Sequence, residues 1–246
     1  MSNSCVITNE EGWYKKALDT DLARPKFAIM NPEITYTLPD YQTQCGCADI
    51  MMHTMERYFV LEDTMEITDK IAQDVMRNVM KYAKILKKDP ENYEARAEIM
   101  WCGSLSHNGL TGCGTCGGDW ATHLIEHELG GMFDVAHGAG LAAVWGSWAR
   151  YVMDEKPERF AQFAVDVMGV EESDDVKSTA LKGIEAVEDF YRMIEMPTNL
   201  KELGIDPTDE QIKDMAMKAT NHDTQQLGAF KKLSAKDLVE IYKTAK

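Results

Sequence analysis

Residues 119–151 read DWATHLIEHELGGMFDVAHGAGLAAVWGSWARY, and this stretch contains three of the six histidines of the chain. His123 and His127 are four residues apart in a segment without proline, so on a helix both imidazoles project from one face. His137 lies fourteen residues beyond His123, and one continuous helix would carry it roughly 21 Å along the axis, at about 1.5 Å per residue. No metal ion spans that distance. If these histidines share a metal, the chain must turn back between His127 and His137.

Glycines mark where this turn is expected. Gly130 and Gly131 follow the first two histidines, and Gly138 and Gly140 follow the third. Glycine readily adopts the backbone conformations that end a helix. We therefore expect a helix break at the paired glycines, after which the chain returns close to the first helix.

A second pair of candidate ligands lies upstream, in the segment CADIMMHTMERYF of residues 47–59. Asp49 and His53 are again four residues apart, in apolar surroundings. Together with His123 and His137 they would provide one carboxylate and three imidazoles. This set suits a borderline divalent cation such as Fe²⁺ or Zn²⁺ better than Ca²⁺ or Mg²⁺, which prefer oxygen ligands.

A competing motif occupies the same helix. His123, Glu126 and His127 fit the H-x-x-E-H pattern of inverted zinc peptidases, in which two histidines bind zinc and the glutamate is the base. Five-residue patterns also arise by chance. The peptidase interpretation leaves His137 and the upstream Asp49 pair unexplained, so it is the weaker of the two.

The cysteines offer a further motif. Cys113 and Cys116 form a C-x-x-C just before the histidine-rich helix, while Cys45 and Cys47 form a C-x-C. A lone C-x-x-C is compatible with half of a zinc knuckle or with a redox pair. The spacing between the two clusters is poor for a structural zinc site, so we favour a plain loop with free thiols.

At these residues the chain resembles the iron-containing alcohol dehydrogenase family, in its butanol dehydrogenase-like branch. The resemblance runs through VITNEEGWYKK, RPKFAIMNPEITYTLP, CADIMMHTMERY, ENYEARAEIMWCGSLSHNGL, DWATHLIEHELGGMFDVAHGAGLA and DLVEIYKTAK, and so covers essentially the whole chain. It implies that Asp49, His53, His123 and His137 hold the catalytic metal, Fe²⁺ or Zn²⁺. It also makes His127 a pocket histidine that could relay the alcohol proton to solvent.

The resemblance further implies an NAD(P)-dependent alcohol dehydrogenase or aldehyde reductase that acts on a small alcohol or aldehyde. By the same resemblance, Lys15 contacts the ribose or phosphate of NAD(P)H, and Thr37 and Leu38 line the nicotinamide side. The choice between NAD and NADP stays open. The alternatives are a catalytically inert metal-binding helical module and one subunit of a split enzyme.

The chain departs from the family pattern at its start. In the family a dinucleotide-binding domain precedes the V-I-T strand, and no G-x-G-x-x-G occurs here between Met1 and Phe59. We expect residues 1–40 to be a two-stranded remnant of that domain. Residues 41–246 should form an all-helical, metal-binding catalytic domain like the C-terminal domain of dehydroquinate synthase. Such a chain is expected to bind metal but to be inactive alone, and to form a homodimer or to pair with a cofactor-binding chain.

Composition limits the classes of partner. The chain has 246 residues, of which 44% are hydrophobic, and a formal net charge of −15. That charge argues against a nucleic-acid surface, since no cluster of Lys and Arg appears. No apolar stretch approaches twenty residues and the N-terminus lacks the features of a signal peptide, so we expect no membrane contact and a cytoplasmic protein with reduced thiols.

Secondary structure is expected to change near Pro39. Residues 4–8 and 25–31 are short β-rich runs, separated by a polar stretch that can start helical. Hydrophobic periodicity predicts helices after that point, and Ser234 is the expected N-cap of the last one. Apart from the two histidine-bearing segments, the expected helices are at residues 67–88, 91–110, 156–169, 173–194, 208–220 and 234–245.

Overall fold

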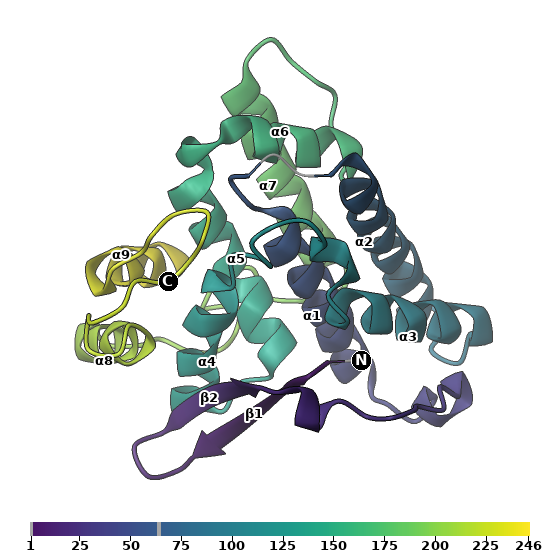
Figure 1. The fold of residues 1–246 in the computed structure, drawn as a ribbon, viewed down its shortest axis with the longest axis horizontal. Coiled ribbons are helices and arrows are strands. Elements are labelled where there is room, and N and C mark those ends of the chain that lie inside the picture. Colours follow the sequence, from purple (N-terminus) through teal and green to yellow (C-terminus); the bar gives the residue numbers. More distant parts are fainter. Residues whose placement is uncertain (1, 63–64) are drawn as a thin grey trace.

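The structure is a computed structural model that describes residues 2–62 and 65–246, and helices dominate it (Figure 1). The mainly helical fold predicted from the sequence is confirmed, and each predicted helix is present with ends shifted by a few residues. The elements are β1 (Ser4–Asn9), β2 (Tyr14–Asp19), η1 (Asp21–Ala23), η2 (Pro32–Thr35), α1 (Asp40–Tyr58), α2 (Glu66–Leu86), α3 (Tyr93–His107), η3 (Leu110–Gly112), α4 (Ala121–Phe133), α5 (His137–Val152), η4 (Met153–Glu155), α6 (Pro157–Asp166), α7 (Val176–Met193), α8 (Asp209–Ala219) and α9 (Ala235–Ala245).

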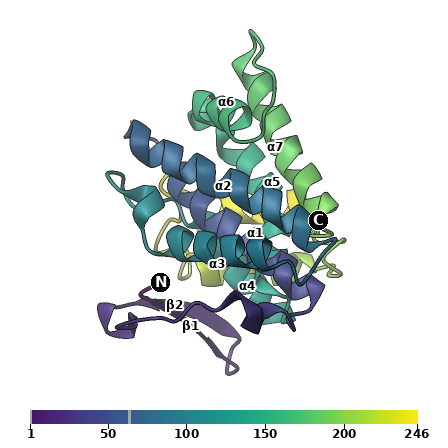
Figure 2. The same ribbon diagram turned by 90° about the vertical axis from the view of Figure 1, so that its right-hand side faces the viewer.

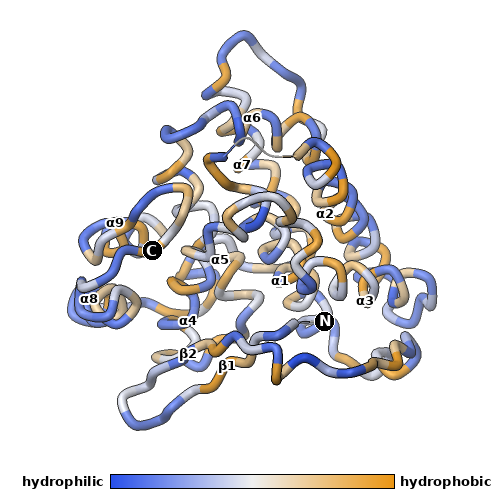
Figure 3. Tube along the Cα trace, in the orientation of Figure 1, coloured by the Kyte–Doolittle hydropathy of each residue, from blue (hydrophilic) through white to orange (hydrophobic). Residues whose placement is uncertain are grey.

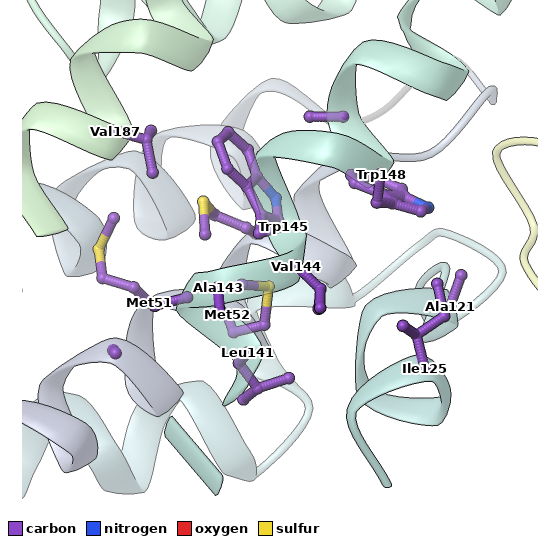
Figure 4. Packing of buried hydrophobic residues seen from close by; sticks show 14 of the residues in the cluster. Met51, Met52, Ala121, Ile125, Leu141, Ala143, Val144, Trp145, Trp148 and Val187 are labelled. Carbon is purple, nitrogen blue, oxygen red and sulfur yellow. The ribbon is translucent and has the colours of Figure 1, made fainter. Parts of the chain in front are cut away.

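Helix α5 forms the centre of the helical body. Its sequence is apolar or small on all sides, as expected for a helix without a solvent face, and it packs against α1, α4, α7 and α9. Trp145 and Trp148 are fully buried, and Figure 4 shows Trp145 and Met52 among the packed side chains of this core. Burying α5 in the core fixes its first residue, His137, at one edge of the helical body.

The outer helices carry the start signals expected from the sequence. Ser234 is the N-cap of α9, and its hydroxyl accepts from the backbone N–H of Asp237 while the Asp237 carboxylate accepts from Ser234 N. This capping box confirms the predicted N-cap. None of the helices in residues 2–62 and 65–246 is long and apolar enough to cross a bilayer.

The N-terminal strands form an antiparallel hairpin that lies as a separate layer along the helical body (Figure 2), with β2 against α4. The strand predicted at residues 25–31 is wrong, because that segment is irregular and the second strand is β2, in the polar stretch. Gly12, at a φ of +87°, turns the chain back directly after β1. Two strands joined by a tight turn can pair through their backbone hydrogen bonds without alternating apolar and polar side chains.

Strand β1 and the segment between it and α1 expose large apolar side chains, seen as orange stretches along the lower edge in Figure 3. Ile7 is 69% exposed, Leu22 96%, Phe27 77% and Ile29 87%. Exposed apolar residues on this scale and in one part of a chain are typical of a surface that contacts further polypeptide.

The turn between α4 and α5 differs from the prediction. The break expected at Gly130 and Gly131 is wrong, since α4 continues through both glycines to Phe133 and ends where Asp134 adopts a left-handed φ of 53°. The glycines are needed for close packing instead. A Cβ on Gly131 would lie 2.7 Å from the carbonyl oxygen of Trp13 in the hairpin turn.

Gly138, the second residue of α5, has a similar role against α1. A Cβ at this position would lie 2.0 Å from the carbonyl oxygen of Cys45, so only glycine allows the two helix backbones to approach this closely. Asp49 lies one turn further along α1. The contact therefore places the start of α5 beside the predicted ligands of α1.

Candidate metal centre

The structure brings together the four residues that the sequence predicts as metal ligands. Asp49 and His53 are one turn apart on α1, His123 is on α4, and His137 is the first residue of α5. The Oδ1 atom of Asp49 lies 3.6 Å from Nε2 of His53, 3.5 Å from Nε2 of His123 and 3.4 Å from Nε2 of His137. Three imidazole nitrogens thus converge on one carboxylate oxygen.

Two buried glutamates hold two of these rings from behind. Nδ1 of His123 hydrogen-bonds to the carboxylate of Glu56, which also accepts from the backbone N–H of His123. Nδ1 of His137 hydrogen-bonds in the same way to Glu126. Because an ionised carboxylate only accepts, each Nδ1 donates its hydrogen, and in the neutral ring the lone pair is on Nε2, facing Asp49. Neither glutamate was recognised from the sequence in this role.

The donor atoms fit a divalent cation. Asp49 Oδ1 and His123 Nε2 are buried and have no hydrogen-bond partner in the described part of the chain, so acceptors face one another across the site. Ligands of a tetrahedral ion with bonds of about 2.1 Å are about 3.4 Å apart, close to the separations from Asp49 Oδ1 found here. One carboxylate with three imidazoles suits Fe²⁺ or Zn²⁺.

The electrostatics of the protein also favour positive charge at this point. Burial alone would raise the pKa of Asp49, but its interactions with the imidazoles of His107, His123 and His137 outweigh it and hold that pKa well below its usual value. Burial would lower the pKa of His123, but Glu56 and Asp49 raise it to about 10. The pKa of His137 is likewise raised by Asp49 and Glu126 against the effect of burial. Burial lowers the pKa of His53 to about 2, so without a metal ion only protons on His123 and His137 balance the carboxylates.

A second group of possible ligands adjoins the first. Glu126, His127 and His137 each offer an atom within 4.8 Å of the others. Here Lys15 of β2 supplies a positive charge, because its Nζ lies 3.2 Å from Glu126 Oε2 and 3.5 Å from His137 Nδ1. The ammonium already neutralises the carboxylate that an ion would need.

The residues predicted to contact the cofactor come from two segments, Lys15 from β2 and Thr37 and Leu38 from the turn before α1. Lys15 points from the hairpin onto Glu126 and His137, a contact that the sequence did not suggest. Thr37 and Leu38 are exposed in the turn that precedes α1. Their contact with a cofactor stays a prediction.

A cavity of about 530 Å³ opens between the hairpin and the ligand-bearing helices. His127 lines it but makes no ion-pair contact with Asp49, unlike the other histidines of the cavity wall. Arg57 is held at its edge by bonds to the carbonyl oxygens of His53 and Ser106 and lies over the ring of Trp120. The cavity gives a small molecule access to the converging nitrogens.

Cys113 and Cys116 are exposed free cysteines in the loop before α4. No cluster of possible metal ligands found among residues 2–62 and 65–246 includes them.

Comparison with known proteins identifies the class to which this fold and site belong. A family model described as "Fe-containing alcohol dehydrogenase family, C-terminal" matches residues 43–246, and the chain belongs to this family. The resemblance noted in the sequence is thereby confirmed.

Individual members of the family show which enzymes the chain is similar to. The chain is 34% identical over 244 residues to NADH-dependent butanol dehydrogenase A of Clostridium acetobutylicum, covering 99% of this chain and 62% of the relative. It is 32% identical over 242 residues to the NADPH-dependent aldehyde reductase YqhD of Escherichia coli, covering 98% and 61%. The crystal structure of NADH-dependent butanol dehydrogenase A from Thermotoga maritima is 35% identical and superposes with a TM-score of 0.92, covering 100% of this chain and 62% of the other. The chain thus spans about three fifths of the length of these relatives.

Proposed function

We propose that the chain is the metal-binding part of an NAD(P)-dependent alcohol dehydrogenase or aldehyde reductase that acts on small alcohols or aldehydes. A divalent ion, Fe²⁺ or Zn²⁺, would be held by Asp49, His53, His123 and His137. The observation that carries the proposal is the convergence of three Nε2 atoms on Asp49 Oδ1 at 3.4–3.6 Å. The relatives named for butanol and aldehyde substrates support the reaction class.

The ion would supply Lewis acidity, polarising the oxygen of an alcohol or aldehyde. The side chains around it set the conditions for that chemistry. Asp49 brings negative charge to the centre of the site, and Glu56 and Glu126 keep two imidazoles oriented with Nε2 inward. Lys15 offsets the charge of Glu126. The carboxylates of Glu56 and Glu126 make the imidazole nitrogens stronger electron-pair donors to a metal ion, and neither carboxylate lines the cavity.

His127 is proposed to carry the proton of the alcohol. It lines the cavity, and its ring centroid is 5.7 Å from that of His137. Burial, together with the charges of His137 and Lys15, lowers the pKa of His127 to about 3, so it is a neutral imidazole at physiological pH. With so low a pKa the ring would not hold the proton as an imidazolium, so the proposed role is a relay in which one ring nitrogen takes up a proton as the other releases one to solvent.

Residues 1–40 are proposed to belong to the cofactor-binding part and residues 41–246 to the metal-binding domain. Hydride transfer requires the nicotinamide ring against the substrate carbon, which places the cofactor at the open side of the cavity, where the hairpin lies. The exposed apolar side chains of the same segment suit contact with further polypeptide. Lys15, Thr37 and Leu38 are the proposed contacts of NAD(P)H from this segment.

The proposal is tested by metal content and turnover together. The purified 246-residue chain should bind one divalent ion, measured by elemental analysis after loading with Fe²⁺ or Zn²⁺ without oxygen. Butanal reduction with NADH or NADPH should be unmeasurable for these residues alone, because the G-x-G-x-x-G at residues 112–117 begins at the end of η3 and does not follow a strand, unlike a phosphate-binding turn. Positioning of the reactants is worth roughly 7–11 kcal/mol. A chain that binds no ion would refute the metal centre. Steady turnover by the chain alone would refute the requirement for further cofactor-binding residues.

A further inference from the structure

His107, the last residue of α3, faces the candidate metal centre, although no sequence motif pointed to it. Its Nε2 lies 3.5 Å from Oδ2 of Asp49, whereas the ion pairs of His53, His123 and His137 with Asp49 are to Oδ1. Its ring packs on that of His53, with centroids 3.7 Å apart and planes tilted by 34°. Both rings line the same cavity.

The other ring nitrogen of His107, Nδ1, is hydrogen-bonded to the protein, as is usual for a histidine that binds a metal through Nε2. Nδ1 lies 2.9 Å from the carbonyl oxygen of Gly103, which can only accept, so Nδ1 donates its hydrogen there. Ser106 Oγ, 2.7 Å from the same Nδ1, directs its own hydrogen to Gly103 O and is a second acceptor for the ring. In the neutral ring the lone pair is therefore on Nε2, pointing at Asp49.

This arrangement repeats that of two proposed ligands. His123 and His137 also donate from Nδ1 to a protein acceptor and turn Nε2 toward Asp49. His127 lines the same cavity but has neither feature among the interactions of the described residues. A histidine held only by packing would not need Nδ1 bonded to a protein acceptor and Nε2 directed at a carboxylate.

We propose that His107 Nε2 is a fifth protein donor to the divalent ion held at Asp49, on the side of Oδ2. The inference rests on the proposed metal centre. One carboxylate and four imidazoles exceed the four ligands of an ordinary zinc site, and they favour an ion that accepts six, such as Fe²⁺, with one position left for substrate.

The experiment uses Co²⁺, a coloured divalent probe, with the full 246-residue chain under anaerobic conditions. Co²⁺ affinity is measured by competition with a chelator, and coordination by visible absorption and by X-ray absorption. His107→Ala is compared with His127→Ala, which removes the same ring from the same cavity. We expect His107→Ala to weaken Co²⁺ binding about tenfold or more, to change the visible spectrum and to lower the imidazole count from four to three. His127→Ala should leave all three unchanged.

His107→Gln protects the test against misfolding, because it keeps a polar side chain at the end of α3 but removes the imidazole. Circular dichroism of each metal-free variant checks the fold, and His107→Gln should show the same loss of one imidazole. Unchanged affinity and spectrum in either folded His107 variant would overturn the inference while leaving the metal centre intact. If the unaltered chain bound no Co²⁺, or if His137→Ala bound it equally well, the proposed metal centre would fail and this inference with it.

Discussion

Two neighbouring clusters contain the same kinds of side chain but differ in charge. Asp49, His53 and His123 form one, and Glu126, His127 and His137 form the other. In the second cluster the Lys15 ammonium contacts the carboxylate. In the first, the imidazole nitrogens of His53 and His123 lie near Oδ1 of Asp49, as does Nε2 of His137 from the second cluster, and no Lys or Arg makes an ion pair with Asp49 in the described residues. We infer from this difference that suitable residue types bind a metal ion less well where a protein cation already neutralises them.

The largest effect that would test this comparison is loss of a ligand. A four-ligand zinc site is worth roughly 10–16 kcal/mol, so His137→Ala should weaken metal binding by on the order of 3 kcal/mol, about a hundredfold. His127→Ala should retain full affinity, because His127 does not contact Asp49. Both are measured by competition with a chelator. The reverse pattern would favour the H-x-x-E-H peptidase interpretation.

Removing the Lys15 ammonium should leave the second cluster, like the first, without a lysine in contact with its carboxylate. Lys15→Met leaves the buried Glu126 carboxylate with the His137 ring but without its ammonium partner, and we expect a loss of about 3 kcal/mol in the unfolding free energy of the metal-free protein. Added Co²⁺ should recover part of this loss by binding near Glu126. The measurement is urea unfolding with and without the ion.

Lys16→Met is the matched control, since Lys16 contacts Glu128 on the same helix but is 57% exposed, and it should cost less than about 1 kcal/mol. Equal losses from both lysine variants would show that the Lys15 contact has no special energetic role.

A smaller effect is expected from the groups behind the ligands. Glu56→Gln weakens the hold on Nδ1 of His123 and should reduce metal affinity about tenfold, or about 1.4 kcal/mol. Glu128→Gln changes a buried carboxylate on α4 that touches no histidine ring, and should leave affinity unchanged. Equal affinities for the unaltered chain and the Glu56 variant would mean that this hydrogen bond does not orient a ligand.

The most gradual effect is with pH. Against burial, which would lower it, Glu56 and Asp49 raise the pKa of His123 to about 10, from about 6.5 in an unfolded chain. The stability from this protonation is complete below about pH 6.5 and is lost as pH rises through about 10, so the metal-free protein should weaken over this range. Metal binding displaces the same protons, so affinity should rise with pH.

Urea unfolding of metal-free and Co²⁺-loaded protein between pH 6.5 and 9.5 measures both slopes. A metal-free protein that gains stability with rising pH would contradict the charge balance assigned to the site.

The sequence predicted the helices and the four converging ligands because both depend on short-range spacing. Asp49 and His53, like His123 and His127, fall on one helix face whenever the segment is helical. The meeting of His123 and His137 required a turn between α4 and α5, and the family resemblance implied that Asp49 and His53 of α1 join them. That turn exists, although Asp134 makes it rather than the paired glycines.

Contacts between distant segments could not be predicted in this way. Nothing in the local sequence shows that Glu56 faces His123, that Lys15 reaches Glu126, or that the end of α3 brings His107 to Asp49. The second strand was misplaced because the prediction followed local composition. The apolar residues at 25–31 were given more weight than the turn at Gly12.

The close approach of Gly138 to the Cys45 carbonyl also bears on the kinetics of folding. These residues are about ninety positions apart, so the contact closes a long loop and cannot form until α1 and α5 dock. A metal ion bridging α1 and α5 would then act after that docking step, slowing the rate of unfolding and leaving the rate of folding almost unchanged. Besides its chemical role, the ion would therefore increase the kinetic stability of the helical domain.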